Sequence, residues 1–392
     1  MTNNAAVAPL HGLRVVEFST LIAGPLTGTA LGDYGAEVIK IEGVTRADQL
    51  RFHPPKRGQV KGGNSARFAQ YNHSKLSLTL DMTQPGSIEA AIALIAQSDV
   101  LLENYSPRVL KGWGLTYERL RSVRPDLVMI SMSALGQTGP HANHIGLGAG
   151  LAARGGFVHA TGWPDREPCL PVGAYTDYIG PPLAVSAILG ALERRRITGK
   201  GAYIDLSQLE APLLFVEPAL LQYQVTGKVA ERQGNGAPDA SPHGAFRCRG
   251  NDAWCAIAVH TDEEWAKLCT VMGKPQLARH ARFATLPARQ QNEAEIENLI
   301  DGWTRERTPM EAMAQLQAAG VNAGAVQKPG DVQSDPQLAH RGYLAVRQHP
   351  DSESFTYHAP PFHISNAPAN VRRFPYLGEH NTYILQDLLG RG

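Results

Sequence analysis

The chain has 392 residues, too many for one simple core, and 43 % of them are hydrophobic, enough for two domains. Its 37 basic and 36 acidic residues nearly cancel, which argues against binding to nucleic acid or an anionic membrane. The N-terminus lacks a signal-like apolar run, and no apolar stretch reaches about 18 residues, so we expect a soluble, cytoplasmic protein without membrane contact. Four cysteines without paired spacing predict reduced thiols: Cys169, Cys248, Cys255 and Cys269.

Strands and helices alternate over the first 205 residues. The expected strands are 13–18, 37–42, 76–80, 100–103, 127–132 and 202–206. Between them we expect helices at 27–34, 84–97, 108–111 and 181–196, and a long polar loop at 45–67 of the kind that covers a site. This alternation predicts a doubly wound, Rossmann-like α/β domain that binds ligands at the carboxyl ends of its strands.

Two common nucleotide motifs are absent from this domain. The first turn, Gly24-Pro-Leu-Thr-Gly28, is not the G-x-G-x-x-G fingerprint of dinucleotide-binding folds. Gly199-Lys200 is followed by glycine rather than Ser or Thr, so it is not a P-loop. The sequence therefore disfavours a nucleotide-binding oxidoreductase.

One acid, Asp177, stands near the start of the expected helix at 181–196. Pro181 and Pro182 suit a first helical turn, which would begin three residues after Asp177. The N–H groups and the positive end of that helix would then keep the carboxylate ionised, as a nucleophile or a base requires. From the residues alone, a simple capping role is the alternative.

Further candidates stand at other strand ends. Lys75 follows a break in the chain, Asn104 and Tyr105 follow a strand, and Lys111 ends the next turn. A lysine suits a phosphate, and an aromatic ring suits a base or an aliphatic chain. Taken singly, each residue fits a solvated lysine or a strand-end turn residue better than a ligand contact.

A second domain follows the first. A helix at 213–225 and a loop at 226–242 lead into a hairpin at 243–259 with a Gly-Asn-Asp turn. Helices at 262–272, 292–306 and 310–319 and a strand at 321–326 complete a smaller α+β domain. We therefore divide the chain into a large domain, a linker, a small domain and a C-terminal return to the large domain: 1–211, 212–240, 241–330 and 331–392.

Three pairs of segments together resemble the family III CoA-transferases. They are Gly173-Ala-Tyr-Thr-Asp177 with the later Thr198-Gly-Lys-Gly201 turn, Ala23-Gly24-Pro25 with Gly35 to Glu42, and Pro242-His-Gly with Thr261-Asp-Glu-Glu-Trp265. This family includes formyl-CoA, carnitine-type and benzylsuccinate-type CoA-transferases, with 2-methylacyl-CoA racemases as an offshoot. The resemblance extends over essentially all 392 residues.

The resemblance implies roles for particular residues. Asp177 would be the residue that becomes acylated, and Gly234 and Gly236 would lie in a glycine loop over the active site, although a plain domain linker would have the same pattern. It also implies an interlocked homodimer, and His144 and His243 are candidates for substrate loops. Gly43 and Gly112 replace basic residues of the family, so Arg46, Arg108 or Lys111 would supply that charge. The residues implied to bind CoA are Ile22, Ala23, Lys75, Asn104 and Tyr105, together with Arg108 and Lys111.

The implied function is transfer of CoA from an acyl-CoA donor to a small carboxylic acid. Asp177 would form an aspartyl acyl anhydride and then an aspartyl-CoA thioester. CoA and acyl-CoA are then substrates, and neither a metal nor a permanently bound cofactor is required. The stretch from Gly162 to Asp177 hints at dicarboxylic or aromatic acids.

Two alternatives remain beside the transferase. A 2-methylacyl-CoA racemase would use Asp177 with a second base such as His144, but Ile145-Gly-Leu-Gly148 replaces the His-Asp-x-Asn-Tyr motif of that branch. A catalytically silent CoA-binding protein is the other.

Overall fold

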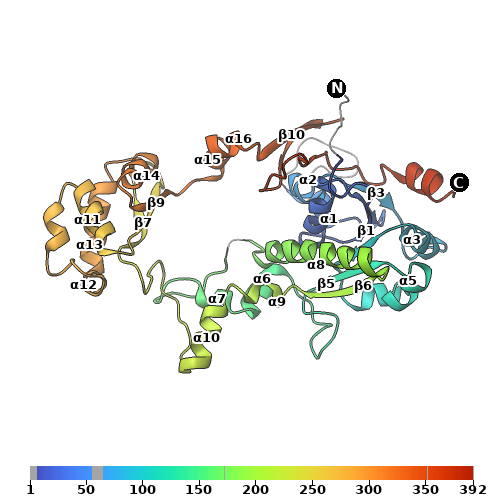
Figure 1. Cartoon of the computed structure of the whole chain (residues 1–392), viewed down its shortest axis with the longest axis horizontal. Helices are drawn as coiled ribbons and strands as arrows, with labels where there is room; N and C mark the ends of the chain where they lie inside the picture. Colours follow the sequence, from blue (N-terminus) through green and yellow to red (C-terminus); the bar gives the residue numbers. More distant parts are fainter. Residues whose placement is uncertain (1–6, 55–64, 172, 351, 392) are drawn as a thin grey trace. The chain divides into compact units, whose positions relative to one another are not determined.

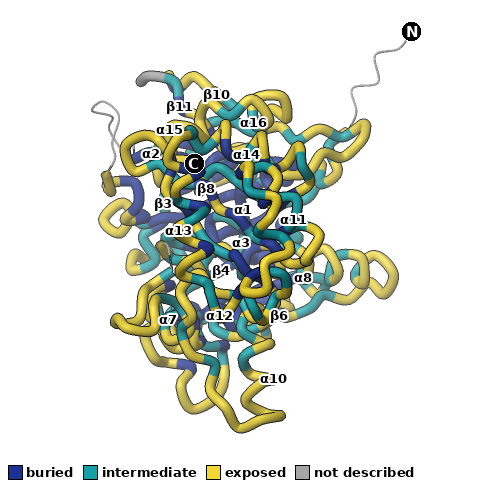
Figure 2. The backbone as a smooth tube through the Cα atoms, turned by 90° about the vertical axis from the view of Figure 1, so that its left-hand side faces the viewer, coloured by how far each residue is buried: buried dark blue, intermediate teal, exposed yellow. Residues whose placement is uncertain are grey.

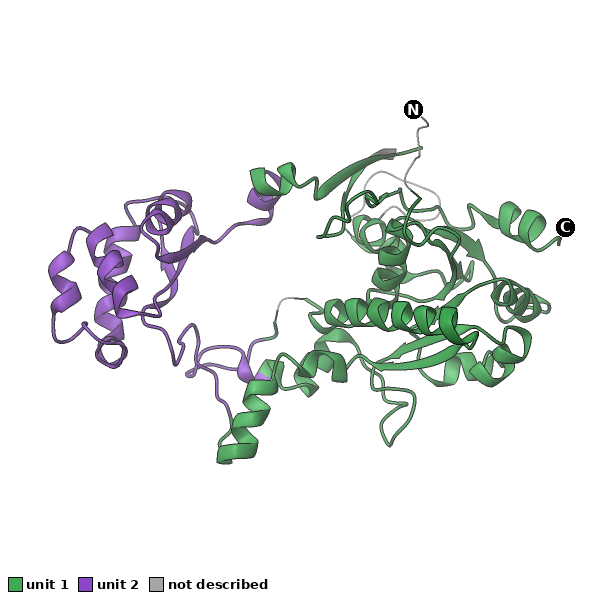
Figure 3. Cartoon of the chain, in the orientation of Figure 1, with its two compact units in different colours: residues 1–158, 170–229, 336–392 green, residues 159–169, 230–335 purple. Residues whose placement is uncertain are grey.

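The computed structural model describes residues 7–54, 65–171, 173–350 and 352–391, without the side chains of 352 and 353. The chain forms two compact units, shown in different colours in Figure 3. Unit 1 comprises Met1–Val158, Leu170–Val229 and Pro336–Gly392, and unit 2 comprises His159–Cys169 and Ala230–Asp335. The sequence had assigned 1–211 to one domain without interruption, whereas the structure gives eleven of those residues, His159–Cys169, to unit 2 and continues unit 1 to Val229.

Unit 1 is built on a parallel sheet of six strands in the order β3-β2-β1-β4-β5-β6. Figure 1 labels four of these strands, β1, β3, β5 and β6. The predicted parallel sheet is thus confirmed, with the strand order reversing between β1 and β4, where α/β folds bind their ligands. The strand bounds are β1 Arg14–Phe18, β2 Glu37–Glu42, β3 Leu76–Thr79, β4 Val100–Glu103, β5 Val128–Ser133 and β6 Ala202–Ser207.

Helices cover both faces of this sheet, because each central strand is apolar on both sides. On one face α1 (Ala23–Asp33) and α8 (Thr176–Thr198) pack on Val15, Val38 and Ile130. On the other face α3 (Ser87–Ala96) and α5 (Tyr117–Val123) pack on Val16, Leu101 and Met129. The shorter elements are η1 Gln49–Phe52, α2 Ala66–Asn72, α4 Arg108–Gly112, α6 Gly148–Arg154, α7 Phe157–Ala160, α9 Glu210–Leu213 and α10 Glu217–Thr226.

Two sequence expectations in this unit are wrong in detail. The loop expected over 45–67 contains η1 and leads into α2, whose N-cap Ser65 accepts from the backbone N–H groups of Arg67 and Phe68; residues 55–64 of that expectation lie outside the described residues. The single helix expected at 213–225 is two helices, α9 and α10, because the chain turns at Leu214 to Val216. No helix among the described residues is long and apolar enough to cross a membrane.

The C-terminal segment of unit 1 contains α16 (Pro336–His340), the antiparallel pair β10 (Leu344–His349) and β11 (Ser352–His358), and η3 (Tyr383–Leu388). It packs on α2 through an aromatic core in which the rings of Phe68 and Phe374 meet edge to face. Backbone N–H groups of Ser77 and Thr79 donate to His380 and Asn381, which ties the segment to β3. The last of these elements, η3, is a short π-helix.

Unit 2 is the smaller α+β unit. Its antiparallel sheet has the order β7-β8-β9, with β7 His243–Arg247, β8 Trp254–Ala258 and β9 Asn322–Ala325, so the predicted hairpin is confirmed. One face of the sheet packs on a core that includes Ile257, Trp265 and Leu316. Its helices are α11 Asp262–Val271, η2 Pro275–Arg279, α12 Leu286–Gln291, α13 Glu293–Thr304, α14 Pro309–Ala318 and α15 Pro329–Gln333.

Candidate active site

Asp177 lies in the first turn of α8, which begins at Thr176. The sequence expected the helix to begin after Asp177, and this is wrong, because Pro181 and Pro182 lie inside the helix. The fixed φ of proline is compatible with a helix, but its missing N–H removes a hydrogen bond. The carbonyl groups of Asp177 and Tyr178, four residues earlier, therefore lack their usual helical donors.

The carboxylate of Asp177 packs against a glycine that the sequence analysis did not single out. A Cβ atom added to Gly148 would stand 2.9 Å from Oδ2 of Asp177 and 2.7 Å from Cβ of Ala174. The buried Thr176 fixes this contact, since its hydroxyl donates to the carbonyl of Gly148 at 3.2 Å. Glycine thus permits an approach that any side chain would block. The only signal in the sequence was the many glycines between Ala134 and Trp163.

Burial decides the electrostatics of Asp177. Desolvation raises the pKa of its carboxyl from 3.8 to about 6. The sequence analysis expected N–H groups at a helix start to hold this carboxylate ionised, whereas the only shift in the pKa of Asp177 comes from desolvation and is upward. At neutral pH the group is still mostly ionised, in a ratio of about ten to one. It is an ionised carboxylate with little solvation, which favours reaction with an electrophile.

A cavity of about 720 Å³ opens at the carboxyl ends of β1, β2, β3 and β4. Its lining includes Phe18, Glu42, Arg46, Tyr105 and Trp113. The rings of Tyr105 and Trp113 meet edge to face with centroids 6.0 Å apart. Burial raises the pKa of Tyr105 to about 12, so its hydroxyl is a donor at any physiological pH. The cavity lies where the strand pattern predicts a ligand, and it offers aromatic faces and the guanidinium of Arg46.

Asn104 holds the loop between β1 and α1. Its side-chain amide accepts from the N–H of Thr20 at 2.9 Å and donates to the carbonyl of Thr20 at 3.0 Å. Next to Thr20, Leu21 has a φ of 66°, a left-handed conformation that is costly for leucine. Ile22 then caps α1, and the buried Ala23 is its first residue. The side chain of Asn104 therefore shapes this loop, with both of its polar ends already engaged.

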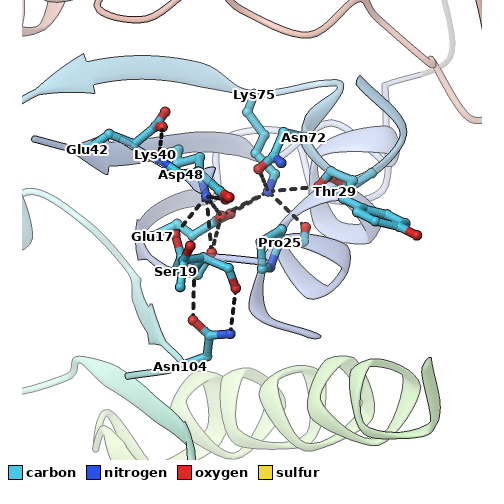
Figure 4. A network of polar contacts seen from close by, with 12 residues as sticks. Glu17, Ser19, Pro25, Thr29, Lys40, Glu42, Asp48, Asn72, Lys75 and Asn104 are labelled. Atoms are coloured by element: carbon cyan, nitrogen blue, oxygen red, sulfur yellow. Dashed lines mark hydrogen bonds and ion pairs between the residues drawn. The ribbon is translucent and has the colours of Figure 1, made fainter. Parts of the chain in front are cut away.

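Lys75 points into the protein (Figure 4). Its Nζ atom lies 2.8 Å from Oε2 of Glu17, 2.8 Å from the carbonyl of Pro25 and 3.1 Å from Oδ1 of Asn72. Burial lowers the pKa of Lys75 to about 8. With these partners the ammonium group is not presented to a phosphate. Arg108 and Lys111 are exposed on α4 and do not line the cavity.

The remaining candidates are divided between the two units. His144 is exposed in unit 1, where its ring centroid lies 4.6 Å from that of His141. In unit 2, Gly234 has a φ of 61°, and a Cβ atom there would stand 2.2 Å from the ring of Trp163. Gly236 donates its N–H to the carbonyl of Gln233, and the ring of His243 contacts the carbonyl of Asn235. His243 also lines an open cavity of about 660 Å³.

Comparison with known proteins gives the class of this chain. The sequence profile described as CoA-transferase family III matches residues 10–381. The succinyl-CoA–D-citramalate CoA-transferase of Chloroflexus aurantiacus is 33 % identical over 100 % of this chain and 96 % of the relative. The succinate–glutarate CoA-transferase of Agrobacterium fabrum is 30 % identical over 97 % of this chain and 96 % of the relative.

A solved structure agrees with the sequence comparisons. The CAIB/BAIF family protein from Brucella suis is 33 % identical and superimposes with a TM-score of 0.89 over 97 % of this chain and 99 % of that protein. The chain belongs to CoA-transferase family III. The named relatives are CoA-transferases rather than racemases, so the resemblance found in the sequence is confirmed and the racemase alternative is not favoured.

Proposed function

We propose that this CoA-transferase moves CoA between dicarboxylic acids through covalent intermediates on Asp177. The observation that carries the proposal is the partly buried carboxylate of Asp177 at the start of α8, which forms no ion pair with any residue that the structure describes. The names of both relatives contain dicarboxylic acids, succinate with citramalate and succinate with glutarate, which supports this class of substrate. A carboxylate without a paired cation keeps its electron pair available for attack.

The proposed reaction has four steps. Asp177 attacks the thioester carbonyl of the donor, the C–S bond breaks, and CoA thiolate leaves an aspartyl acyl anhydride. The thiolate then attacks the aspartyl carbonyl and expels the donor carboxylate, which leaves an aspartyl-CoA thioester. The acceptor carboxylate displaces the thiolate to give a second anhydride. The thiolate finally attacks the acceptor carbonyl, which releases the new CoA ester and restores the carboxylate of Asp177.

We place the nucleotide end of CoA in the cavity at the strand ends of unit 1. Tyr105 and Trp113 offer faces for an adenine or a pantetheine stem, and the guanidinium of Arg46 offers charge for a phosphate. Ile22 and Ala23 would lie along the substrate through the loop that Asn104 holds. Lys75 would not contact CoA itself. It would support the loop between β1 and α1 through its contacts with Glu17 and the carbonyl of Pro25.

The glycine loop and a second copy of the chain belong to the same proposal. The glycine loop at Gly234 and Gly236 stays a prediction, because the N–H groups of both glycines donate to backbone carbonyls, those of Gly162 and Gln233. A homodimer is supported by α10 and the two residues Leu214 and Phe215 before it, because α10 has no buried residue (Figure 2). Six large apolar side chains in this segment are 48 % to 84 % exposed, and a second copy of the chain would cover them. They are Leu214, Phe215, Leu220, Leu221, Tyr223 and Val225. Light scattering should give twice 42.3 kDa.

The proposed route uses CoA and acyl-CoA as substrates and needs neither a metal nor a redox cofactor. Cys169, Cys248, Cys255 and Cys269 are free thiols, and their state fits the cytoplasm, the location that we propose.

Replacement of the nucleophile tests the mechanism. Asp177→Asn keeps the shape of the side chain and removes its negative charge, so turnover should fall by about 10⁴-fold or more. Calorimetric binding of CoA should stay within about threefold of wild type, because the cavity at the strand ends is unchanged. Normal turnover in this variant would refute the assignment of Asp177.

A further inference from the structure

Two tyrosine hydroxyl groups meet beside Asp177. The hydroxyl of Tyr71, on α2, lies 2.5 Å from the hydroxyl of Tyr178, the residue that follows Asp177 on α8. The two rings meet edge to face with centroids 6.2 Å apart. Each phenol carries one proton, and their mutual hydrogen bond uses only one of the two. The pair therefore retains one proton that it can donate to an anion.

A cation stands on the same face of α2. Arg67 precedes Tyr71 by four residues, a spacing that places two side chains side by side on a helix. Its side chain is exposed, and its guanidinium has no hydrogen-bond or ion-pair partner within the part of the chain that the structure describes. Burial and the bond to Tyr178 raise the pKa of Tyr71, the charge of Arg67 lowers it, and the charge of Asp177 raises it. Tyr71 thus lies within electrostatic reach of both charges.

The position of Tyr71 is fixed from behind. Its carbonyl accepts from the hydroxyl of Thr29 at 2.8 Å and from Nζ of Lys75 at 3.3 Å. At the other end of α2, the hydroxyl of Ser65 accepts from the N–H of Arg67 at 3.2 Å. These bonds hold the backbone of α2, so the tyrosine hydroxyl loses little freedom when it binds a ligand.

We propose that Arg67, Tyr71 and Tyr178 form an anion subsite that binds the second carboxylate of a dicarboxylic acyl group while its first carboxyl carbon reacts at Asp177. This inference rests on the proposed function and names how the substrate class is recognised. An acid with two negative charges is repelled by the carboxylate of Asp177. The guanidinium of Arg67 and the free hydroxyl proton of the tyrosine pair offset this repulsion at the second carboxylate, whereas a monocarboxylic acyl group has no second carboxylate for them to bind.

Acylation of Asp177 in a single turnover tests the subsite with two matched donors, succinyl-CoA and butyryl-CoA. They have the same chain length, and only the first carries a second carboxylate. Arg67→Gln should slow acylation by succinyl-CoA by about 10- to 100-fold and by butyryl-CoA by less than about threefold, because a charge-assisted bond is lost only with the dicarboxylic group. Tyr71→Phe and Tyr178→Phe should slow the succinyl reaction alone, by about 5- to 30-fold.

Tyr175→Phe is the matched control. Tyr175 stands at the same end of α8 and contacts Phe157 and Phe215 through its ring, so loss of its hydroxyl should leave both rates unchanged. Three results would overturn the subsite without affecting the assignment of Asp177 as the nucleophile. The variants could lose the same factor in acylation rate with both donors, they could lose none with succinyl-CoA, or the wild type could react faster with butyryl-CoA. A wild type in which neither donor labels Asp177 would overturn the proposed function as well.

Discussion

Two carboxyl groups of unit 1, those of Glu17 and Asp177, differ in whether a cation lies next to them. The side chain of Glu17 is fully buried and lies 2.8 Å from Nζ of Lys75 and 3.3 Å from Nζ of Lys40, in the network of Figure 4. Asp177 is partly buried, and desolvation alone accounts for its raised pKa. The comparison distinguishes a structural role from a catalytic one. The charge of Glu17 is compensated by lysines and helps to hold the loop between β1 and α1. The charge of Asp177 has no such compensation among the described residues and is available to the substrate.

The largest effect should come from breaking the compensated network at Lys40. Its Nζ atom lies 2.8 Å from the carbonyl of Ser19 and 3.2 Å from Asp48. Lys40→Met would leave Glu17 and Asp48 buried with less compensation, so the free energy of unfolding should fall by about 3–5 kcal/mol. Urea unfolding followed by circular dichroism measures this loss.

The exposed ion pair between Arg196 and Glu193 provides the control for Lys40. Arg196→Gln should leave the urea midpoint almost unchanged, because solvent screens that pair. Equal midpoints for Lys40→Met and Arg196→Gln would contradict the structural role of the buried network.

A smaller effect of the opposite sign should follow from removal of the uncompensated charge. Between about pH 4 and about pH 6 the folded chain keeps the proton of Asp177 that the unfolded chain releases, so stability falls as pH rises through this window. Asp177→Asn should therefore raise the free energy of unfolding by up to about 2 kcal/mol at about pH 8, and by almost nothing below about pH 4. Urea unfolding at both pH values measures the difference. A variant that is less stable than wild type at the higher pH would contradict the raised pKa.

The smallest effect tests the geometry around Asp177 rather than its charge. Gly148→Ala would press a methyl group on Oδ2 of Asp177 and on Ala174, so kcat should fall by about tenfold while the KM for acyl-CoA changes little. Steady-state kinetics measures both constants. Gly150→Ala, on the same helix with open space around it, should leave kcat unchanged. Similar values of kcat for the two variants would contradict a positioning role for Gly148.

Much of the fold could be predicted because its signals are local. The apolar run of β4 begins and ends at the predicted residues, Val100 and Glu103, and the Gly-Asn-Asp turn placed β7 and β8. The start of α8 could not be predicted, because two prolines normally open a helix and here lie within one. The fixed φ of proline suits either position.

The site was less predictable because its contacts join distant parts of the sequence. In the sequence, Lys75 resembles a phosphate-binding lysine. In the folded chain it pairs with Glu17, which is 58 residues away in the sequence. Tyr71 and Tyr178 are 107 residues apart, and neither stands in a recognisable motif. Asp177 was identified by resemblance, and its raised pKa depends on burial, which no local pattern reports.

The most direct measurement is mass spectrometry of the protein after incubation with succinyl-CoA and a quench with hydroxylamine or borohydride. The account predicts modification at Asp177, with a rate about tenfold lower at about pH 5 than at about pH 7.5, since the carboxyl is mostly protonated at the lower pH. An unmodified Asp177 across a panel of acyl-CoA donors, or a modified residue elsewhere in the chain, would contradict it.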